Sequence, residues 1–178
     1  MTDISYKLGG AFGEISADSL PGSKQSPDAI GGILTGVAIN YDFSTSFSHH
    51  YQGQILIDIT NNQVLRVGAE TGLAYHLLGA SRRHTYVPSL VYLSSWSLSV
   101  SLRGGIFNYT AVASGNQSSK IKGQVLEFKV GGELRFDISS STCYGAEAFS
   151  TLTTIASSVD RVNPSLVEMS IYVRKFLY

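Results

Sequence analysis

The sequence predicts an all-β protein that folds as a closed, antiparallel, up-and-down β-barrel, with eight strands favoured. The main observation is that apolar residues recur at every second position over long segments, as they do when successive side chains of a strand point to opposite faces. Short and long connections alternate between these segments, as in a barrel with tight turns at one end. No segment shows a clear helical periodicity.

Residues 124–138 show the alternation most clearly. One face of this segment carries apolar side chains at Leu126, Phe128, Val130, Leu134, Phe136 and Ile138. The other face carries Glu127, Lys129, Glu133, Arg135 and Asp137. A helix would mix these two sets, whereas a strand separates them completely, so we expect a strand here.

The other expected strands follow the same rule. Those with apolar residues on one face and glycine, polar or charged residues on the other are 4–14, 32–43, 51–60, 64–77, 96–107, 142–152 and 165–178. Residues 85–93 are apolar on both faces, and Pro88 there needs a position that requires no backbone donor. Counting from residue 32 gives eight strands in one barrel domain, residues 1–178. Residues 1–29 are then an N-terminal strand or extension, and nine or ten strands result if residues 4–14 join the barrel.

The expected connections fall into two groups. The short turns are 61–63, 94–95 and 139–141. The longer connections are 44–50, 78–84, 110–123 and 153–164. Because the two kinds alternate from residue 32 onward, we expect the short turns at one end of the barrel and the longer ones at the other.

Composition excludes several classes of protein. Thirteen basic and thirteen acidic residues give a net charge of zero, which argues against a nucleic-acid binder held by phosphate contacts. The single cysteine, Cys143, excludes an internal disulfide framework. No apolar stretch approaches the roughly 20 residues of a membrane-spanning helix. No basic start followed by an apolar block marks a signal peptide, so we expect an exported form of this chain to have lost one.

The placement of glycine, charge and aromatic residues predicts which face of the strands points inward. Glycines such as Gly68 and Gly131 lie on the polar face, where they make room for larger neighbours inside a narrow barrel. Acids and bases gather on the same face in near balance, so they can pair in an interior. The segments are also long enough to cross a bilayer, which takes roughly 9–11 tilted residues. Aromatic residues cluster near strand ends, as in the girdles of membrane barrels, at Tyr41, Phe43, Tyr75, Trp96, Phe136 and Tyr144.

The apolar face is therefore expected to meet lipid and the charged face to line the lumen. The expected lumen charge network is Asp58, Arg66, Glu70, Arg103, Glu127, Lys129, Glu133, Arg135, Asp137, Glu147, Glu168 and Arg174. The expected lipid-facing residues are Ile55, Ile57, Val67, Leu73, Leu98, Val100, Leu126, Phe128, Val130, Leu134, Ile171 and Val173. With Phe107, Tyr109 and Phe149 also pointing inward, the lumen would be largely filled, and no wide aqueous channel is expected.

With these features the chain resembles the small bacterial outer-membrane β-barrels of the outer-membrane protein A and X type, over most of residues 30–178. The terminal residues SIYVRKFLY are similar to that family's C-terminal strand, which ends in an aromatic residue and is read by the barrel-assembly machinery. The resemblance implies a bacterial outer-membrane location, assembly from the periplasm, tight turns in the periplasm and longer loops outside the cell. It implies outer-membrane lipid, lipopolysaccharide and the assembly machinery as partners, while the partner of the loops stays open.

Motifs that carry chemistry are missing from the sequence. There is no glycine-rich phosphate loop, no HExxH and no GxSxG, and no catalytic residue is assigned. His49 and His50 lie in an expected loop and make a poor chelating pair, so neither a metal site nor a cofactor is expected. His76 is expected to be a hydrogen-bonded lumen histidine. The basic loop residues Arg82, Arg83 and His84 are candidates for contact with lipopolysaccharide phosphates.

Three functions remain open at this point. The favoured one is an integral outer-membrane barrel that acts in envelope structure or surface interaction through its longer loops. The alternative is a barrel-embedded acyl hydrolase or acyltransferase that modifies lipid A. A further alternative is a soluble, lipocalin-like binder of an apolar ligand, whose apolar face would point inward.

Overall fold

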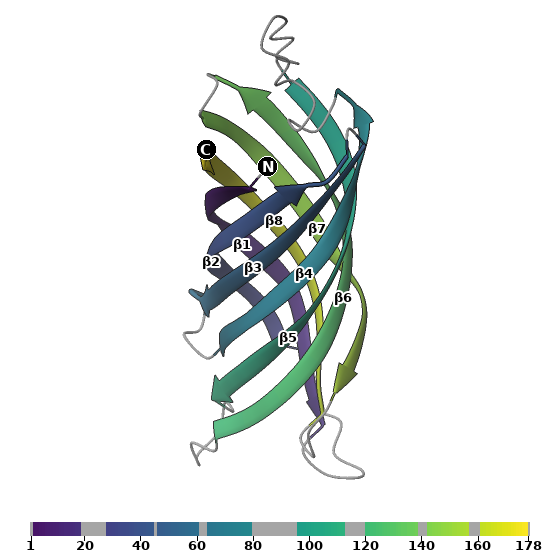
Figure 1. The fold of residues 1–178 in the computed structure, drawn as a ribbon. Helices are drawn as coiled ribbons and strands as arrows, with labels where there is room; N and C mark the ends of the chain where they lie inside the picture. The colour runs from purple at the N-terminus through teal and green to yellow at the C-terminus, as the bar shows by residue number, and fades with distance from the viewer. Residues whose placement is uncertain are drawn as a thin grey trace, which may run out of the picture.

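Eight long strands form a closed barrel (Figure 1). The structure, a computed structural model, describes residues 2–18, 28–44, 46–60, 64–79, 96–112, 120–138, 142–156 and 161–177. The strands are β1 (Thr2–Asp18), β2 (Asp28–Asp42), β3 (Phe47–Asp58), β4 (Val64–Leu78), β5 (Trp96–Val112), β6 (Lys120–Asp137), β7 (Thr142–Ala156) and β8 (Arg161–Leu177). Each strand pairs antiparallel with the next and β1 pairs with β8, which confirms the expected all-β, up-and-down barrel of eight strands.

Alternating side chains explain why the sheet closes in this form. In β3, side chains alternate between exposed and buried along the whole strand. The outward positions carry mostly β-branched, aromatic and leucine side chains, and the inward positions carry glycine, polar and charged residues and, in part of the barrel, apolar ones. A closed sheet pairs every strand on both sides and leaves no edge open. Among the described residues, no helix is long and apolar enough to cross a membrane.

The first strand belongs to the barrel. β1 pairs with β2 from Thr2↔Tyr41 onward, and with β8 from Thr2↔Leu177 onward. The number of strands is nevertheless eight, because β4 pairs directly with β5. Residues 85–93, which we expected to be a strand, lie outside the described residues. The expected number of strands was right, but the set of strands was wrong: it left out the first strand and placed one between β4 and β5. Local alternation does not reveal which strands close the barrel.

The two ends of the barrel differ from the expectation as well. We call the end where β1 begins and β8 finishes the terminal end, and the other the opposite end. Connections after β2, β4 and β6 lie at the terminal end, and the remaining connections lie at the opposite end. β3 and β4 are therefore joined at the opposite end, and β6 and β7 at the terminal end, because there is one strand fewer between these two connections than expected. All three expected short turns, 61–63, 94–95 and 139–141, lie outside the described residues.

Several residues expected in loops belong to strands. β3 begins at Phe47, inside the expected loop 44–50. β5 extends to Val112 and β6 begins at Lys120, which shortens the expected loop 110–123. β7 and β8 likewise extend into the expected loop 153–164.

An apolar cluster occupies the interior toward the opposite end. The inward positions of Phe107 and Tyr109 were expected, whereas the other members of this cluster were not singled out in the sequence. Several strands are apolar on both faces here, as at Ile55, Leu56 and Ile57. The buried members of this cluster are Ala11, Ile15, Ile30, Leu34, Leu56, Val64, Phe107, Tyr109, Val125, Val162 and Leu166.

Candidate functional site in the barrel interior

The residues expected to line the lumen lie inside the barrel. Those that are buried as whole residues are Asp58, Arg66, Glu70, Arg103, Glu127, Lys129, Arg135, Glu147, Glu168 and Arg174. Glu133 and Asp137 are half-buried, but their side chains are only 12% and 2% exposed. Each strand places these side chains inward because their sequence neighbours are apolar and point outward.

A continuous chain of alternating charges crosses the middle of the interior. Lys7 Nζ lies 2.7 Å from Glu147 Oε2. Arg103 Nη2 lies 2.7 Å from the same carboxylate, and Arg103 Nη1 lies 3.2 Å from Glu70 Oε1. Each acid in this part of the chain therefore contacts a cation from another strand.

The chain continues from Glu70 through Lys129 to the wall formed by β8. Lys129 Nζ lies 2.9 Å from Glu70 Oε2 and 2.8 Å from Glu168 Oε1. Arg66 Nη1 lies 2.9 Å from Glu168 Oε1, and Arg66 Nη2 lies 2.8 Å from Glu127 Oε2. We call the whole set the central network; its members are Lys7, Arg66, Glu70, Arg103, Glu127, Lys129, Glu147 and Glu168.

Aromatic rings complete the packing around the guanidinium groups. Arg66 Cζ lies 3.7 Å from the ring centroid of Phe107, and Arg103 Cζ lies 3.5 Å from that of Phe149. Tyr109 donates a hydrogen bond to Glu127 Oε1. The three rings are buried, so the cations meet π-faces instead of water.

Two glutamines of β3 link the network to that side of the barrel. Lys7 Nζ donates to Gln52 Oε1, and Gln52 Nε2 donates to Gln54 Oε1 at 3.0 Å. Gln54 Nε2 in turn donates to Glu70 Oε2 at 3.2 Å. β2 presents Gly36 at this level, where a Cβ would lie 2.8 Å from the Gly53 carbonyl oxygen. The network is therefore hydrogen-bonded on several sides, which offsets the cost of burying its charges.

A second polar layer lies nearer the terminal end. Asn40 Nδ2 donates to Asp3 Oδ1 at 2.6 Å, and Arg174 Nε lies 3.4 Å from the same oxygen. Arg174 Nη2 lies 2.8 Å from Glu133 Oε1, and Tyr172 donates a hydrogen bond to that oxygen. The expected residues Glu133 and Arg174 are thus brought together here, apart from the central network.

The remaining expected lumen residues lie at the two ends of the barrel. Arg135 Nε is 3.4 Å from Asp137 Oδ1 at the terminal end. Asp58 lies at the opposite end, where it accepts hydrogen bonds from Thr60 N at 3.0 Å and from Thr60 Oγ1 at 2.6 Å. Asp58 therefore fixes the end of β3.

The described histidines all lie in strands. His49 and His50 are in β3 and not in a loop, with His50 buried and His49 on the outer face. His76 Nε2 lies 3.2 Å from Ser48 Oγ, inside the barrel. Among the described residues, no group of three or more His, Cys, Asp or Glu side chains is arranged to hold a metal ion.

The Ser48–His76 contact resembles one of the two hydrogen bonds of a hydrolytic triad, so the partner of the second histidine nitrogen decides whether a triad is present. In a hydrolytic triad an acid binds the second ring nitrogen of the histidine. His76 Nδ1 is buried and has no hydrogen-bond partner among the described residues. The pair therefore lacks the group that would orient the imidazole for catalysis.

Sequence reasoning missed several interior residues. Lys7 and Asp3 come from β1, whose place in the barrel the pattern did not assign. Gln52 and Gln54 stood on the polar face of the expected strand 51–60 and were passed over because they carry no charge. Position on the polar face was the signal available for all four.

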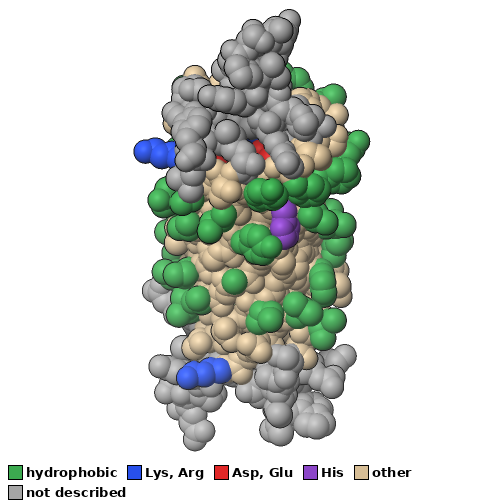
Figure 2. All heavy atoms as spheres, in the orientation of Figure 1, with side chains coloured by type: hydrophobic (Ala, Val, Ile, Leu, Met, Phe, Trp, Pro, Cys, Tyr) green, Lys and Arg blue, Asp and Glu red, His purple; other side chains and the backbone are tan. Residues whose placement is uncertain are grey.

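The outer face carries the large apolar side chains (Figure 2). Of the residues expected to face lipid, Leu98, Leu126 and Leu134 are half-exposed and the others are exposed. The most exposed are Ile171 at 66% and Leu73 at 54%.

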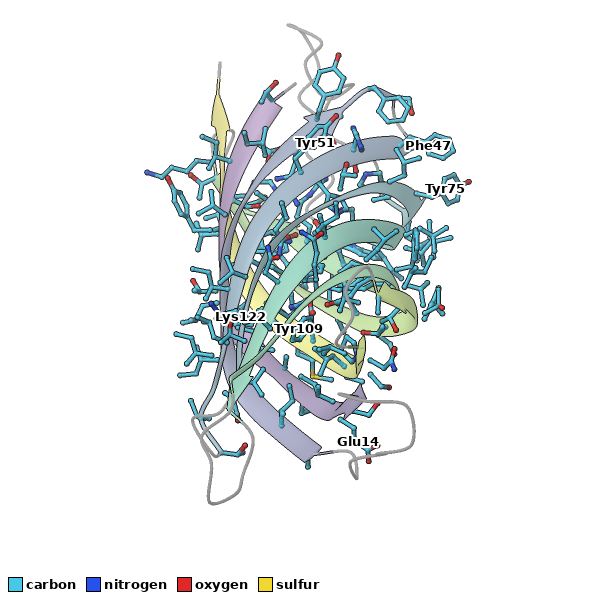
Figure 3. All side chains as sticks on the ribbon, turned by 90° about the horizontal axis from the view of Figure 1, so that it is seen from below. Glu14, Phe47, Tyr51, Tyr75, Tyr109 and Lys122 are labelled. Atoms are coloured by element: carbon cyan, nitrogen blue, oxygen red, sulfur yellow. The ribbon has the colours of Figure 1, made fainter. Side chains whose placement is uncertain are left out.

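Outward aromatic residues form a ring at the terminal end. Figure 3 shows Phe47 and Tyr75 pointing outward side by side, with ring centroids 5.1 Å apart. Phe43 stacks on Phe47 at 6.0 Å, and Phe136 lies 6.2 Å from Tyr144. All of the aromatic residues singled out in the sequence lie at this end, because the strands that carry them run in alternating directions. We call this set, with Tyr41 and Trp96, the aromatic girdle.

Arg82, Arg83 and His84 lie outside the described residues. Their contact with lipopolysaccharide stays a prediction.

No family model matches the sequence, and no curated protein matches it. The crystal structure of Neisserial surface protein A is similar, with a TM-score of 0.64 and 11% identity over 98% of this chain and 97% of that chain. The N-terminal β-barrel domain of Pseudomonas aeruginosa OprF gives a TM-score of 0.54 and 10% identity over 97% of this chain and 96% of that one. The outer membrane protein OprG from Pseudomonas aeruginosa gives a TM-score of 0.53 and 13% identity over 99% of this chain and 96% of that one. The fold is therefore that of the small outer-membrane β-barrels, as the resemblance in the sequence implied.

Proposed function

We propose that the protein is an integral bacterial outer-membrane barrel that acts in envelope structure or surface interaction through the connections between its strands. The observation that carries this proposal is the inside-out distribution of side chains. Leu102 and Ile171 are 62% and 66% exposed, whereas Arg66 and Glu127 are fully buried. A soluble monomer rarely exposes an apolar surface of this extent, whereas lipid requires one.

A charged and largely filled interior is part of the proposal. The central network crosses the barrel, and the apolar cluster packs toward the opposite end. An eight-stranded barrel has an interior that side chains just fill. This arrangement favours a scaffold over a wide aqueous channel, with stability supplied by closed backbone pairing and interior ion pairs.

The proposed partners follow from the location. Outer-membrane lipid would cover the apolar band, lipopolysaccharide would meet exposed basic residues, and the assembly machinery would bind β8. The names of the similar structures, a surface protein and an outer membrane protein, support this location. The alternatives are less well supported: a soluble binder needs the opposite side-chain arrangement, and the Ser48–His76 pair lacks an orienting acid.

The test is refolding with and without phospholipid vesicles, followed by conductance measurement. We expect a protease-resistant species only with vesicles or detergent, which migrates faster on a denaturing gel before heating than after. In planar bilayers we expect no stable conductance steps from the folded protein. A monodisperse folded species in plain buffer would refute the membrane location, and reproducible conductance steps would refute the filled interior.

A further inference from the structure

A polar pair interrupts the apolar outer face near the terminal end. His49 Nε2 lies 2.8 Å from Thr71 Oγ1, and this hydroxyl also lies 3.1 Å from the His50 carbonyl oxygen. The donor and acceptor in this pair depend on the tautomer of the imidazole; when the Thr71 hydroxyl donates to Nε2, a neutral ring carries its own proton on Nδ1. Tyr51 packs edge-on against the imidazole with centroids 4.5 Å apart. Within the described part of the chain, His49 Nδ1 has no hydrogen-bond partner.

His49 also lies away from the charged side chains of the outer face in the described strands. On the outer face of the described strands, the other ionisable nitrogen and carboxyl side chains lie near the barrel ends. Lys175 lies at the terminal end, and Glu14 and Lys122 lie toward the opposite end (Figure 3). Figure 2 shows a histidine amid hydrophobic side chains on this face. Because a polar atom facing hydrocarbon is costly without a partner, this nitrogen needs a hydrogen-bonding group from outside the described chain.

An open apolar groove begins beside the pair. Its volume is about 670 Å³, and its walls include Leu73, Tyr75, Leu102 and Phe128. Gly104 forms part of the floor; a Cβ there would lie 3.3 Å from Phe128 Cε1. The groove runs from the aromatic girdle, at Phe47 and Tyr75, to the apolar outer face. His49 and Thr71 are among its lining residues.

The depth of His49 matches the border between headgroups and acyl chains. It stands two residues from Phe47 along β3, which at a rise of about 3.3 Å per residue is roughly 6–7 Å along the strand. Aromatic girdles of membrane proteins lie at headgroup level. His49 therefore lies just inside that level.

We propose that this groove binds one acyl chain of a glycerophospholipid and that His49 donates a hydrogen bond from Nδ1–H to an oxygen of its phosphate. Thr71 is a positioning residue that fixes the ring through Nε2. One N–H donor serves one oxygen of a phosphodiester, whereas a lipid with several phosphates would leave charges without partners here. The inference rests on the proposed membrane location.

The test counts lipids that remain bound when the protein is extracted from phosphatidylglycerol vesicles and measured by native mass spectrometry. We expect His49→Leu to weaken retention about tenfold, the effect of losing one hydrogen bond to a charged group. Thr71→Val is expected to weaken it less. Thr35→Val is the matched control, because Thr35 is an outward threonine that donates to the Lys7 carbonyl oxygen at 3.2 Å, and it should change nothing.

A second pair of variants tests the groove. Gly104→Leu should fill it and abolish retention, whereas Gly53→Leu adds a side chain where a Cβ meets nothing within 4 Å and should retain lipid normally. Diacylglycerol, which lacks the phosphate, should bind weakly. Equal retention by His49→Leu, equal binding of diacylglycerol, or displacement of phosphatidylglycerol by equimolar lipopolysaccharide would overturn the proposal. If the protein inserts into vesicles but retains no lipid, this inference fails alone; if it does not insert, the membrane location fails too.

Discussion

Replacing Arg66 by methionine probes the central network most sharply. Arg66 is fully buried, donates to Glu127 through Nε at 3.0 Å and Nη2 at 2.8 Å, and lies 2.9 Å from Glu168. Lys129 stays 2.8 Å from Glu168 but 3.8 Å from Glu127, so Glu127 loses its main cation. Removing one partner of a buried ion pair costs about 3–5 kcal/mol because the other charge stays buried and unpaired. We expect Arg66→Met to lower the free energy of unfolding by this amount.

The assay is urea unfolding of the protein in phospholipid vesicles, followed by Trp96 fluorescence. The double variant Arg66→Met/Glu127→Gln removes the unpaired charge and should recover at least half of the loss. Lys122→Met removes an outward charge near the opposite end and should change stability by no more than about 0.5 kcal/mol. A loss below about 1 kcal/mol for Arg66→Met, or no recovery in the double variant, would refute the role given to the central network.

Three further predictions follow from the geometry. Val130→Arg places a charge on the outer face and should lower stability in vesicles by about 2–4 kcal/mol if Val130 lies near the bilayer midplane, measured by the same urea titration. Gly131→Ala should cost about 1–3 kcal/mol, because its Cβ would lie 2.1 Å from the Ala148 carbonyl oxygen, whereas Gly53→Ala should be neutral; equal effects would contradict the inward assignment. Cys143 is fully buried, so a maleimide reagent should label it only after unfolding, and rapid labelling of the folded protein would contradict its placement.

The faces of the strands could be read from the sequence because period-two alternation is a local property. In residues 124–138 the inward and outward sets could be separated without knowing any pairing partner. The structure places Lys129 and Arg135 inside and Phe128 and Val130 outside, in the phase that the alternation predicts.

Pairing and closure could not be read in the same way. Whether residues 4–14 or 85–93 belong to the ring depends on contacts between distant segments, and both alternate or are apolar locally. Because residues 85–93 were counted as a barrel strand, the later turns were expected at the wrong ends of the barrel. Closure of β1 on β8 joins residues at opposite ends of the chain, which no local pattern specifies.

The partners within the interior were equally beyond local reasoning. Lys7 and Glu147 are 140 residues apart in sequence, and their contact depends on barrel diameter and strand stagger. The apolar cluster left a detectable signal, since inward positions such as Leu56 and Val125 are apolar near strand ends. We did not use that signal, because the inward face was assigned from its charged residues alone.

The central claim is that apolar side chains face hydrocarbon while polar ones fill a closed barrel. Nitroxide labels at consecutive cysteines from residue 96 to 102, in a Cys143→Ser background in vesicles, test it most directly through their collisions with oxygen and with a water-soluble nickel complex. We predict oxygen collisions that peak at positions 96, 98, 100 and 102 and low values for both reagents between them. Peaks of the nickel complex at positions 97, 99 and 101, where Ser97, Ser99 and Ser101 are buried, would contradict the account.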